Sequence, residues 1–316
     1  MAHPSGEGQR GLLVHADAVD ACLALPQNRK VDLVYIDPPY GVGATMSART
    51  RKGEARGRKK ADSGPDAYDD AMQADDLAAM VARAAGAIRE RMAPHAALFI
   101  HMDQRAIHET KIACDRVLGR GAFAGEIVWE PGNGARGRGV PTTHQTILIY
   151  ARRASDRAKL RWDSTSPLLR EPFAETSLAM HFKKRDAEGR QYRDRTINGK
   201  TYRYYADEGR RLGSVWTDIP AMSANTPILK EGTGYPTQKP LRLLERIVLA
   251  ASAPGDTVAD FMCGSGTTLI AAARHGRGFI GGDASKVAIK TTSARLDAEG
   301  IAYERLTSSR KAALPK

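Results

Sequence analysis

The stretch Thr257-Val258-Ala259-Asp260-Phe261-Met262-Cys263-Gly264-Ser265-Gly266-Thr267-Thr268 decides the fold class of this chain. A short apolar segment leads into two glycines, and the run from Leu269 to Arg274 that follows has the pattern of a helix. A strand, a glycine turn and a helix in this order bring backbone N–H groups and a helix N-terminus close to a bound ligand. The stretch therefore predicts an α/β fold with a ligand site at the turn.

A second strand follows over residues 278–283, and it ends in an acid. Asp283 lies 17 residues after Gly266, near the distance at which an acid binds the ribose hydroxyls in a βαβ nucleotide site. Thr267 stands where a phosphate-binding P-loop needs lysine, and the third glycine of a dinucleotide fingerprint is absent. The pattern disfavours the phosphate-cradling chemistry of an NTPase.

Far upstream, the motif Asp37-Pro38-Pro39-Tyr40 ends the apolar run from Val31 to Ile36. It places a carboxylate, rigid backbone carbonyls and an aromatic ring where a buried strand ends. Tyr40 can stack on a planar heterocycle, while Asp37 and the Pro38 carbonyl can accept the two hydrogens of an exocyclic amine. On its own the motif is equally compatible with a strand that ends in a Pro-Pro turn.

The order of elements predicts a doubly wound, mainly parallel sheet. Besides the strands already named, we expect strands over 12–17 and 97–102, helices over 18–25, 75–92 and 109–118, and a hairpin formed by 126–130 and 145–151. Such sheets bind ligands in the crevice at the carboxyl ends of their strands. Asp37 and Gly264 both follow strands, so we expect one crevice to hold both motifs.

Together these residues resemble the DNA amino-methyltransferases that use S-adenosylmethionine, and their order resembles the permuted β class. Tyr235-Pro236-Thr237-Gln238-Lys239-Pro240 is similar to that family's segment for the methionine end of the cofactor. The resemblance runs from about Leu12 to about Leu296. One departure is Phe261-Met262, where many relatives have Pro-Phe, and we expect altered packing with intact cofactor binding.

The resemblance implies a Rossmann-like methyltransferase fold and specific roles for residues of both motifs. The catalytic residues would be Asp37, Pro38, Pro39 and Tyr40. The residues that bind S-adenosylmethionine would be Asp17, Ala18, Thr237, Lys239, Asp260, Phe261, Gly264, Ser265, Gly266, Thr267 and Asp283. Asp17 is also a candidate N-cap of the helix over 18–25, and Cys263 is expected to be a packing residue and not a nucleophile. No metal is expected.

The implied reaction is methyl transfer to the N6 amine of adenine in duplex DNA, with the target base flipped out of the helix. Methylation of cytosine N4 is the closest alternative, although relatives that act on cytosine more often have Ser in place of Asp37. RNA or protein-glutamine methyltransferases usually have the two motifs in the opposite order. A DNA-binding subunit without catalytic activity would not need both motifs intact.

The charge distribution supports a polyanionic partner, because the net charge is +12. We interpret the basic stretch from Ala44 to Gly64 as a mobile arm that becomes ordered on phosphates, the alternative being a solvated insertion. The loop over 131–143 and the basic and aromatic region over 152–234 are further DNA candidates. The predicted DNA-binding residues are Arg49, Arg51, Lys52, Arg56, Arg58, Lys59, Lys60, Arg136, Arg138, Arg193, Arg195 and Arg203.

The resemblance also implies a division of the chain. Residues 1–151 and 235–305 would form the catalytic domain, 152–234 the target-recognition region and 306–316 a basic tail. Three scattered cysteines fit a reducing bacterial cytoplasm, and we expect neither a secretory signal nor a membrane span. The sequence leaves open the recognition site, a homodimer and a separately encoded restriction endonuclease.

Overall fold

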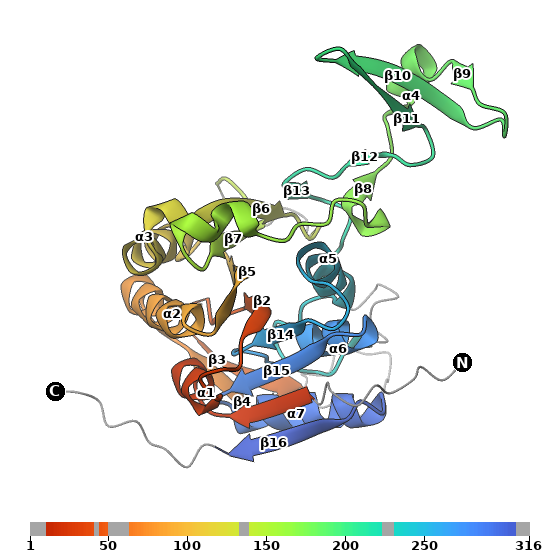
Figure 1. Ribbon diagram of the computed structural model, residues 1–316. Helices are drawn as coiled ribbons and strands as arrows, with labels where there is room; N and C mark the ends of the chain where they lie inside the picture. Colours follow the sequence, from red (N-terminus) through yellow and green to blue (C-terminus); the bar gives the residue numbers. More distant parts are fainter. Residues whose placement is uncertain (1–10, 41–43, 50–62, 133–138, 223–230, 308–316) are drawn as a thin grey trace, which may run out of the picture.

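The computed structural model describes residues 11–40, 44–49, 63–132, 139–222 and 231–307. Its centre is a nine-stranded sheet (Figure 1). The strand order is β13 (Val215–Trp216), β6 (Phe123–Trp129), β7 (Gln145–Ala151), β5 (Met92–Met102), β2 (Val31–Ile36), β14 (Thr257–Asp260), β15 (Gly278–Asp283), β1 (Gly11–His15) and β16 (Tyr303–Thr307). The neighbouring strands β5, β2, β14, β15, β1 and β16 run parallel to one another. Strand β7 is antiparallel to β5 and β6. The predicted mainly parallel sheet is confirmed.

Helices cover both faces of this sheet, as expected for a doubly wound fold. One face carries α1 (Ala18–Ala24), α2 (Ala74–Arg89) and α3 (Ile107–Leu118), and the other carries α5 (Leu241–Ala251), α6 (Thr267–Arg274) and α7 (Lys286–Ala298). The side chains of β2 alternate between the two cores: Val34 and Ile36 pack in the first, and Leu33 and Tyr35 in the second. A strand buried on both faces explains why Leu33 to Ile36 follow one another without a charged residue between them.

The predicted elements differ from the observed ones mainly at their ends. The helix expected over 75–92 is α2, which ends at Arg89, and β5 begins at Met92, before Pro94 and earlier than the expected Ala97. Pro94 is tolerated there because the pairing of β5 with β2 shifts register between Val31 and Leu33. The hairpin of β6 and β7 is confirmed.

The basic segment from Ala44 to Gly64, interpreted above as a mobile arm, includes regular structure at both of its ends, and its ordering on phosphates stays a prediction. Strands β3 (Ala44–Arg49) and β4 (Ser63–Asp70) pair antiparallel, with Ala44 opposite Asp70. The two strands form a sheet separate from the nine-stranded one, and their polar composition shows no apolar alternation from which the pairing could be predicted. The residues between them, 50–62, lie outside the described part of the chain.

Part of the region over 152–234 projects away from the sheet (Figure 1). The short strands β8 (Arg170–Glu171) and β12 (Arg210–Arg211) form its neck, and α4 (Glu175–His181), β9 (Lys184–Arg185), β10 (Gln191–Ile197) and β11 (Lys200–Tyr205) form its far end. In contrast, Trp216 of β13 is buried in the main sheet. No helix in the described ranges is long and apolar enough to cross a membrane.

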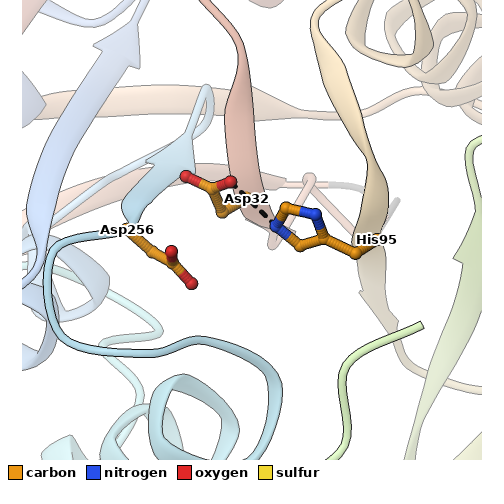
Figure 2. A group of neighbouring side chains, drawn as sticks. All are labelled: Asp32, His95 and Asp256. Atoms are coloured by element: carbon orange, nitrogen blue, oxygen red, sulfur yellow. Dashed lines mark hydrogen bonds and ion pairs between the residues drawn. The ribbon is translucent and has the colours of Figure 1, made fainter. Parts of the chain in front are cut away.

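A polar cluster joins the amino-terminal ends of β2, β5 and β14 (Figure 2). Asp32 Oδ1 lies 2.9 Å from His95 Nε2, and Asp32 Oδ2 accepts a hydrogen bond from the Thr257 N–H at 2.8 Å. Asp256 accepts from the Ala253 N–H at 2.7 Å and pairs with Arg161. These hydrogen bonds and ion pairs within the protein account for the clustering of the three side chains. The same contacts hold the strand ends together.

The cluster yields a stability prediction. Asp32→Ala leaves the Thr257 N–H without its acceptor and His95 without its partner, so we expect the free energy of unfolding to fall by about 1–3 kcal/mol. Urea denaturation measures this change. Asp32→Asn is the matched control, since its amide oxygen can still accept from Thr257, and its loss should be smaller. Equal stability of Asp32→Ala and the unaltered chain would contradict the role of the cluster.

Candidate active site

Two motifs distant in sequence meet because β2 and β14 are neighbours in the sheet. Leu33 pairs with Val258 and Val34 with Ala259, both in parallel register. Asp37 follows the end of β2, Asp260 ends β14, and Asp283 ends β15. All three acids therefore lie at the same sheet edge, where a parallel sheet binds ligands.

A cavity of about 1000 Å³ occupies this edge. The predicted residues that line it are Asp17, Ala18, Asp37, Pro39, Thr237, Lys239, Asp260, Phe261, Gly264, Ser265, Thr267 and Asp283. It is also lined by Tyr35, Tyr235 and Met262, which were not among the predicted cofactor-binding residues, and by residues of α2 such as Met80. The crevice expected for both motifs is therefore present in the described part of the chain.

The glycine turn approaches its neighbours too closely for side chains. Gly264 and Gly266 have φ angles of 50° and 76°, in the left-handed region that favours glycine. A Cβ at Gly264 would lie 3.0 Å from the Tyr235 ring, and one at Gly266 would lie 2.7 Å from Thr292 Cγ2. The Asp283 carboxylate fixes the turn by accepting a hydrogen bond from the Gly264 N–H at 2.9 Å.

Asp260 is a buried acid at the base of this turn. It accepts hydrogen bonds from Thr268 Oγ1 at 2.6 Å and from the Met262 N–H at 3.1 Å. Burial nevertheless raises the pKa of Asp260 to about 7, because removal from water disfavours the charged form more than these donors stabilise it. Burial also raises the pKa of Asp283.

Asp37 is held by two donors, one on each carboxylate oxygen. The Tyr40 hydroxyl donates to Oδ1 at 2.6 Å, and the Lys239 ammonium pairs with Oδ2. Lys239 is only 6% exposed, and its Nζ lies 5.0 Å from the centre of the Tyr40 ring. Burial, followed by the charge of Asp37, raises the pKa of Tyr40 well above its usual value, so the hydroxyl remains a donor.

Aromatic residues pack behind Tyr40. His101 lies between Tyr35, Tyr40 and Trp129, with ring-centre distances of 6.0, 6.5 and 5.6 Å. Its Nδ1 is 2.7 Å from the Tyr35 hydroxyl oxygen. Burial, with a smaller contribution from the charge of Lys239, lowers the pKa of His101 well below its usual value, and the imidazole is neutral. The only sequence signal for His101 was its place near the end of a predicted strand.

Asp17 caps α1 and also lines the cavity. Its Oδ1 accepts from the N–H groups of Val19 and Asp20, both at 2.9 Å. The N-cap interpretation is therefore confirmed, whereas cofactor binding by Asp17 stays a prediction. Burial raises the pKa of Cys263 well above its usual value, which keeps it a thiol and supports a packing role.

Most of the predicted DNA-binding residues lie outside the described part of the chain: Arg51, Lys52, Arg56, Arg58, Lys59, Lys60, Arg136 and Arg138. Arg49 is the last residue of β3. Arg193, Arg195 and Arg203 all lie on β10 and β11, at the far end of the projecting part. Their role in DNA binding stays a prediction.

The fold and the site together define an α/β protein with a Rossmann-like ligand cavity at the carboxyl edge of its sheet. The DNA methylase family matches residues 31–294, and the chain belongs to this family.

Among individual relatives, the sequence identity is low or the match covers only part of the chain. The chain is 27% identical to the type II methyltransferase M.EcaI of Enterobacter cloacae, over 85% of this chain and 65% of that protein. It is 42% identical to the DNA adenine methyltransferase YhdJ of Escherichia coli K12, over 31% of this chain and 33% of that protein. The chain thus spans less than two thirds of the length of both relatives.

Among solved structures, the cytosine-N4-specific PvuII DNA methyltransferase is similar in fold, with a TM-score of 0.57. The match covers 92% of this chain and 89% of that one, at 14% sequence identity. At this identity the comparison shows the shared fold alone.

The raised pKa of Asp260 yields a prediction for unfolding without ligand. The folded protein holds this proton more tightly than the unfolded chain, so the resulting stabilisation is complete below pH 3.8 and is lost as the pH rises to about 7. Asp260→Asn removes the ionisable group. Relative to the unaltered protein, the variant should therefore gain about 2–3 kcal/mol between pH 5 and pH 8.

Chemical denaturation at the two pH values measures this difference, and the contributions of titrating groups that do not interact with Asp260 cancel in it. A stability difference between variant and unaltered protein that is the same at pH 5 and pH 8 would refute the assignment of a buried, protonated Asp260.

Proposed function

We propose that this protein transfers a methyl group from S-adenosylmethionine to the N6 amine of adenine in duplex DNA. One observation carries the proposal: Asp37, held by Tyr40 and Lys239, lines the same cavity as the glycine turn and Asp283. An acceptor for an amine and a turn suited to a nucleoside cofactor thus share one cavity of about 1000 Å³, large enough for a cofactor together with a single base.

The described residues fit S-adenosylmethionine. The glycine turn packs against Tyr235 and Thr292 where a side chain would clash, which leaves its backbone at the cavity, and we assign Asp283 at the end of β15 to the ribose hydroxyls. Phe261 offers an apolar wall, and the segment from Tyr235 to Lys239 lines the part of the cavity that we assign to the methionine end. When bound, this cofactor supplies an electrophilic methyl group on a sulfonium.

Asp37 is the residue that prepares the amine. Its carboxylate oxygens keep lone pairs beyond those that bind Tyr40 and Lys239, and these can accept an amine hydrogen. Because the lone pair of the amine is delocalised into the ring, we infer that positioning and burial supply most of the acceleration. Two donors already fix the carboxylate, so little reorganisation is needed when the base arrives.

Tyr40 contributes through its hydroxyl as well as its ring. The hydroxyl orients Asp37. The ring is 7% exposed and is not among the residues that line the cavity, so we infer that a base that has left the helix stacks on it only after neighbouring side chains move. Flipping a base costs a few kcal/mol, and stacking together with backbone contacts offsets part of that cost. Lys239, which was predicted from the sequence to bind the cofactor, has the second role of holding the Asp37 carboxylate in place.

Adenine is favoured over cytosine by Asp37 and by the similarity to YhdJ, which is named an adenine methyltransferase. Cytosine N4 methylation is the second candidate, because the PvuII enzyme with a similar fold is described as cytosine-N4-specific. With chromosomal DNA as substrate, the proposal implies a location in the bacterial cytoplasm. A homodimer and a separate restriction endonuclease are compatible with it and are not required by it.

The test uses labelled S-adenosylmethionine, duplex DNA and mass spectrometry of the digested nucleosides. We expect N6-methyladenine from the unaltered protein and a kcat lower by about 10²–10³-fold in Asp37→Asn, with cofactor affinity changed by less than about threefold. Asp37→Asn is preferred to Asp37→Ala, because the alanine leaves the buried Lys239 ammonium without a side-chain acceptor at this position.

Asp32→Asn, at the opposite edge of the sheet, is the control and should retain full turnover. N4-methylcytosine as the product would favour the second candidate. Undiminished turnover in Asp37→Asn would refute the role given to this carboxylate.

A further inference from the structure

The hairpin of β10 and β11 has two faces that differ in charge. Directly opposed residues of an antiparallel pair lie on the same face, and successive residues alternate between faces. Tyr192, Asp194 and Thr196 therefore share one face with their partners Tyr205, Arg203 and Thr201. Arg193, Arg195 and Ile197 share the other face with Tyr204, Tyr202 and Lys200.

The first face, the Asp194 face, is neutralised by its own ion pairs. Arg203 donates to Asp194 at 3.0 Å and lies over the Tyr192 ring at 3.8 Å. Lys184 pairs with the same carboxylate at 3.1 Å. Arg190 pairs with Asp207 at 2.9 Å and with Glu208 at 3.2 Å. A cation already paired in this way gains less from a phosphate, because it must first give up its acid.

On the second face, Arg193 has a structural role near the α4 end of the hairpin. Its guanidinium lies over the rings of Phe182, Phe173 and Tyr204 at 5.0, 5.4 and 5.5 Å. Phe173 and Phe182 are buried, so Arg193 joins the hairpin to the segment that contains α4. Of the three predicted arginines of this region, Arg193 and Arg203 are thus held by contacts within the protein.

The rest of the second face combines cations with an exposed aromatic and an exposed aliphatic side chain. Arg195 and Lys200 are exposed, and neither has an acidic partner within the residues that the structure describes. Tyr202 is 41% exposed, Ile197 is 39% exposed, and Lys200 Nζ lies 5.4 Å from the Tyr202 ring centre. We name Arg195, Ile197, Lys200 and Tyr202 the Arg195 face.

We propose that the Arg195 face contacts the sugar–phosphate backbone of the DNA on which the active site acts. This inference rests on the proposed function, which makes DNA the partner of the Arg195 face. Cations without acidic partners match a polyanion, whereas the paired cations of the opposite face do not. The hairpin projects far from the nine-stranded sheet (Figure 1), which suits contact with the duplex away from the target base. The contact is with phosphates, so it positions the protein and reads no sequence.

The experiment compares two double variants that lower the net charge equally. Arg195→Ala with Lys200→Ala alters the Arg195 face, and Lys184→Ala with Arg203→Ala alters the Asp194 face. Fluorescence anisotropy with a labelled duplex gives the binding constant over a range of KCl concentrations. The slope of log K against log[KCl] reports the phosphate contacts, at about 0.9 for each contact.

We expect the magnitude of this slope to fall by about 1.8 in the Arg195-face variant and to stay unchanged in the Asp194-face variant. The fall should be the same on cognate and random duplexes, because phosphates carry no sequence. Thermal melting checks that both variants are folded, and kcat at saturating DNA should be unchanged in both.

An equal change of slope in the two variants, or none in the Arg195-face variant, would overturn the proposal and leave this face free for another partner, such as a protein. A loss confined to the cognate duplex would also overturn it, because that result means base readout. Failure of the proposed function is distinguishable, because the unaltered protein would then bind DNA without methylating it.

Discussion

The pairing of β2 with β14 is the constraint on which the rest of the site depends. Only Leu33–Val258 and Val34–Ala259 are in register, yet this pairing brings Asp37 and the glycine turn to one edge although more than 220 residues separate them. A slip by one residue would turn the side chains of β2 towards the wrong core, since Val34 and Ile36 pack on one face and Leu33 and Tyr35 on the other. Packing on both faces therefore fixes the geometry of the site.

Several acidic residues line the cavity. Three of them, Asp37, Asp260 and Asp283, are stabilised in different ways. Asp37 is paired with Lys239, burial raises the pKa of Asp260 to about 7, and Asp283 accepts hydrogen bonds from backbone N–H groups of the glycine turn and of Ser285. These arrangements differ because only Asp37 has a buried cation as a direct partner. The acid to which we assign the amine is thus held in one orientation, while a neighbouring acid supports the turn.

Local patterns in the sequence predicted the elements that build the site, and most of the catalytic and cofactor-binding residues predicted from them line the cavity. Contacts between distant segments were beyond such patterns. Lys239 reaches Asp37 across 202 residues, and nothing near either residue indicates the pair. His101 was missed because a buried histidine resembles any other strand residue, and β3 and β4 because they lack apolar alternation. The three arginines Arg193, Arg195 and Arg203 differ in their partners. This difference became visible only from the strand register and from the acidic residue on the opposing strand.

The central claim is that one cavity holds the amine of a base and the methyl donor at the same time. The most direct test is the affinity, by calorimetry, of a compound that joins adenine through N6 to an adenosyl-amino-acid analogue of the donor. A molecule that spans both parts of one site resembles the transition state and should bind at least about 10²-fold more tightly than S-adenosylhomocysteine, with Asp37→Asn removing most of that gain. Affinity no higher than that of S-adenosylhomocysteine would mean that the two parts do not share a site, and would contradict the account.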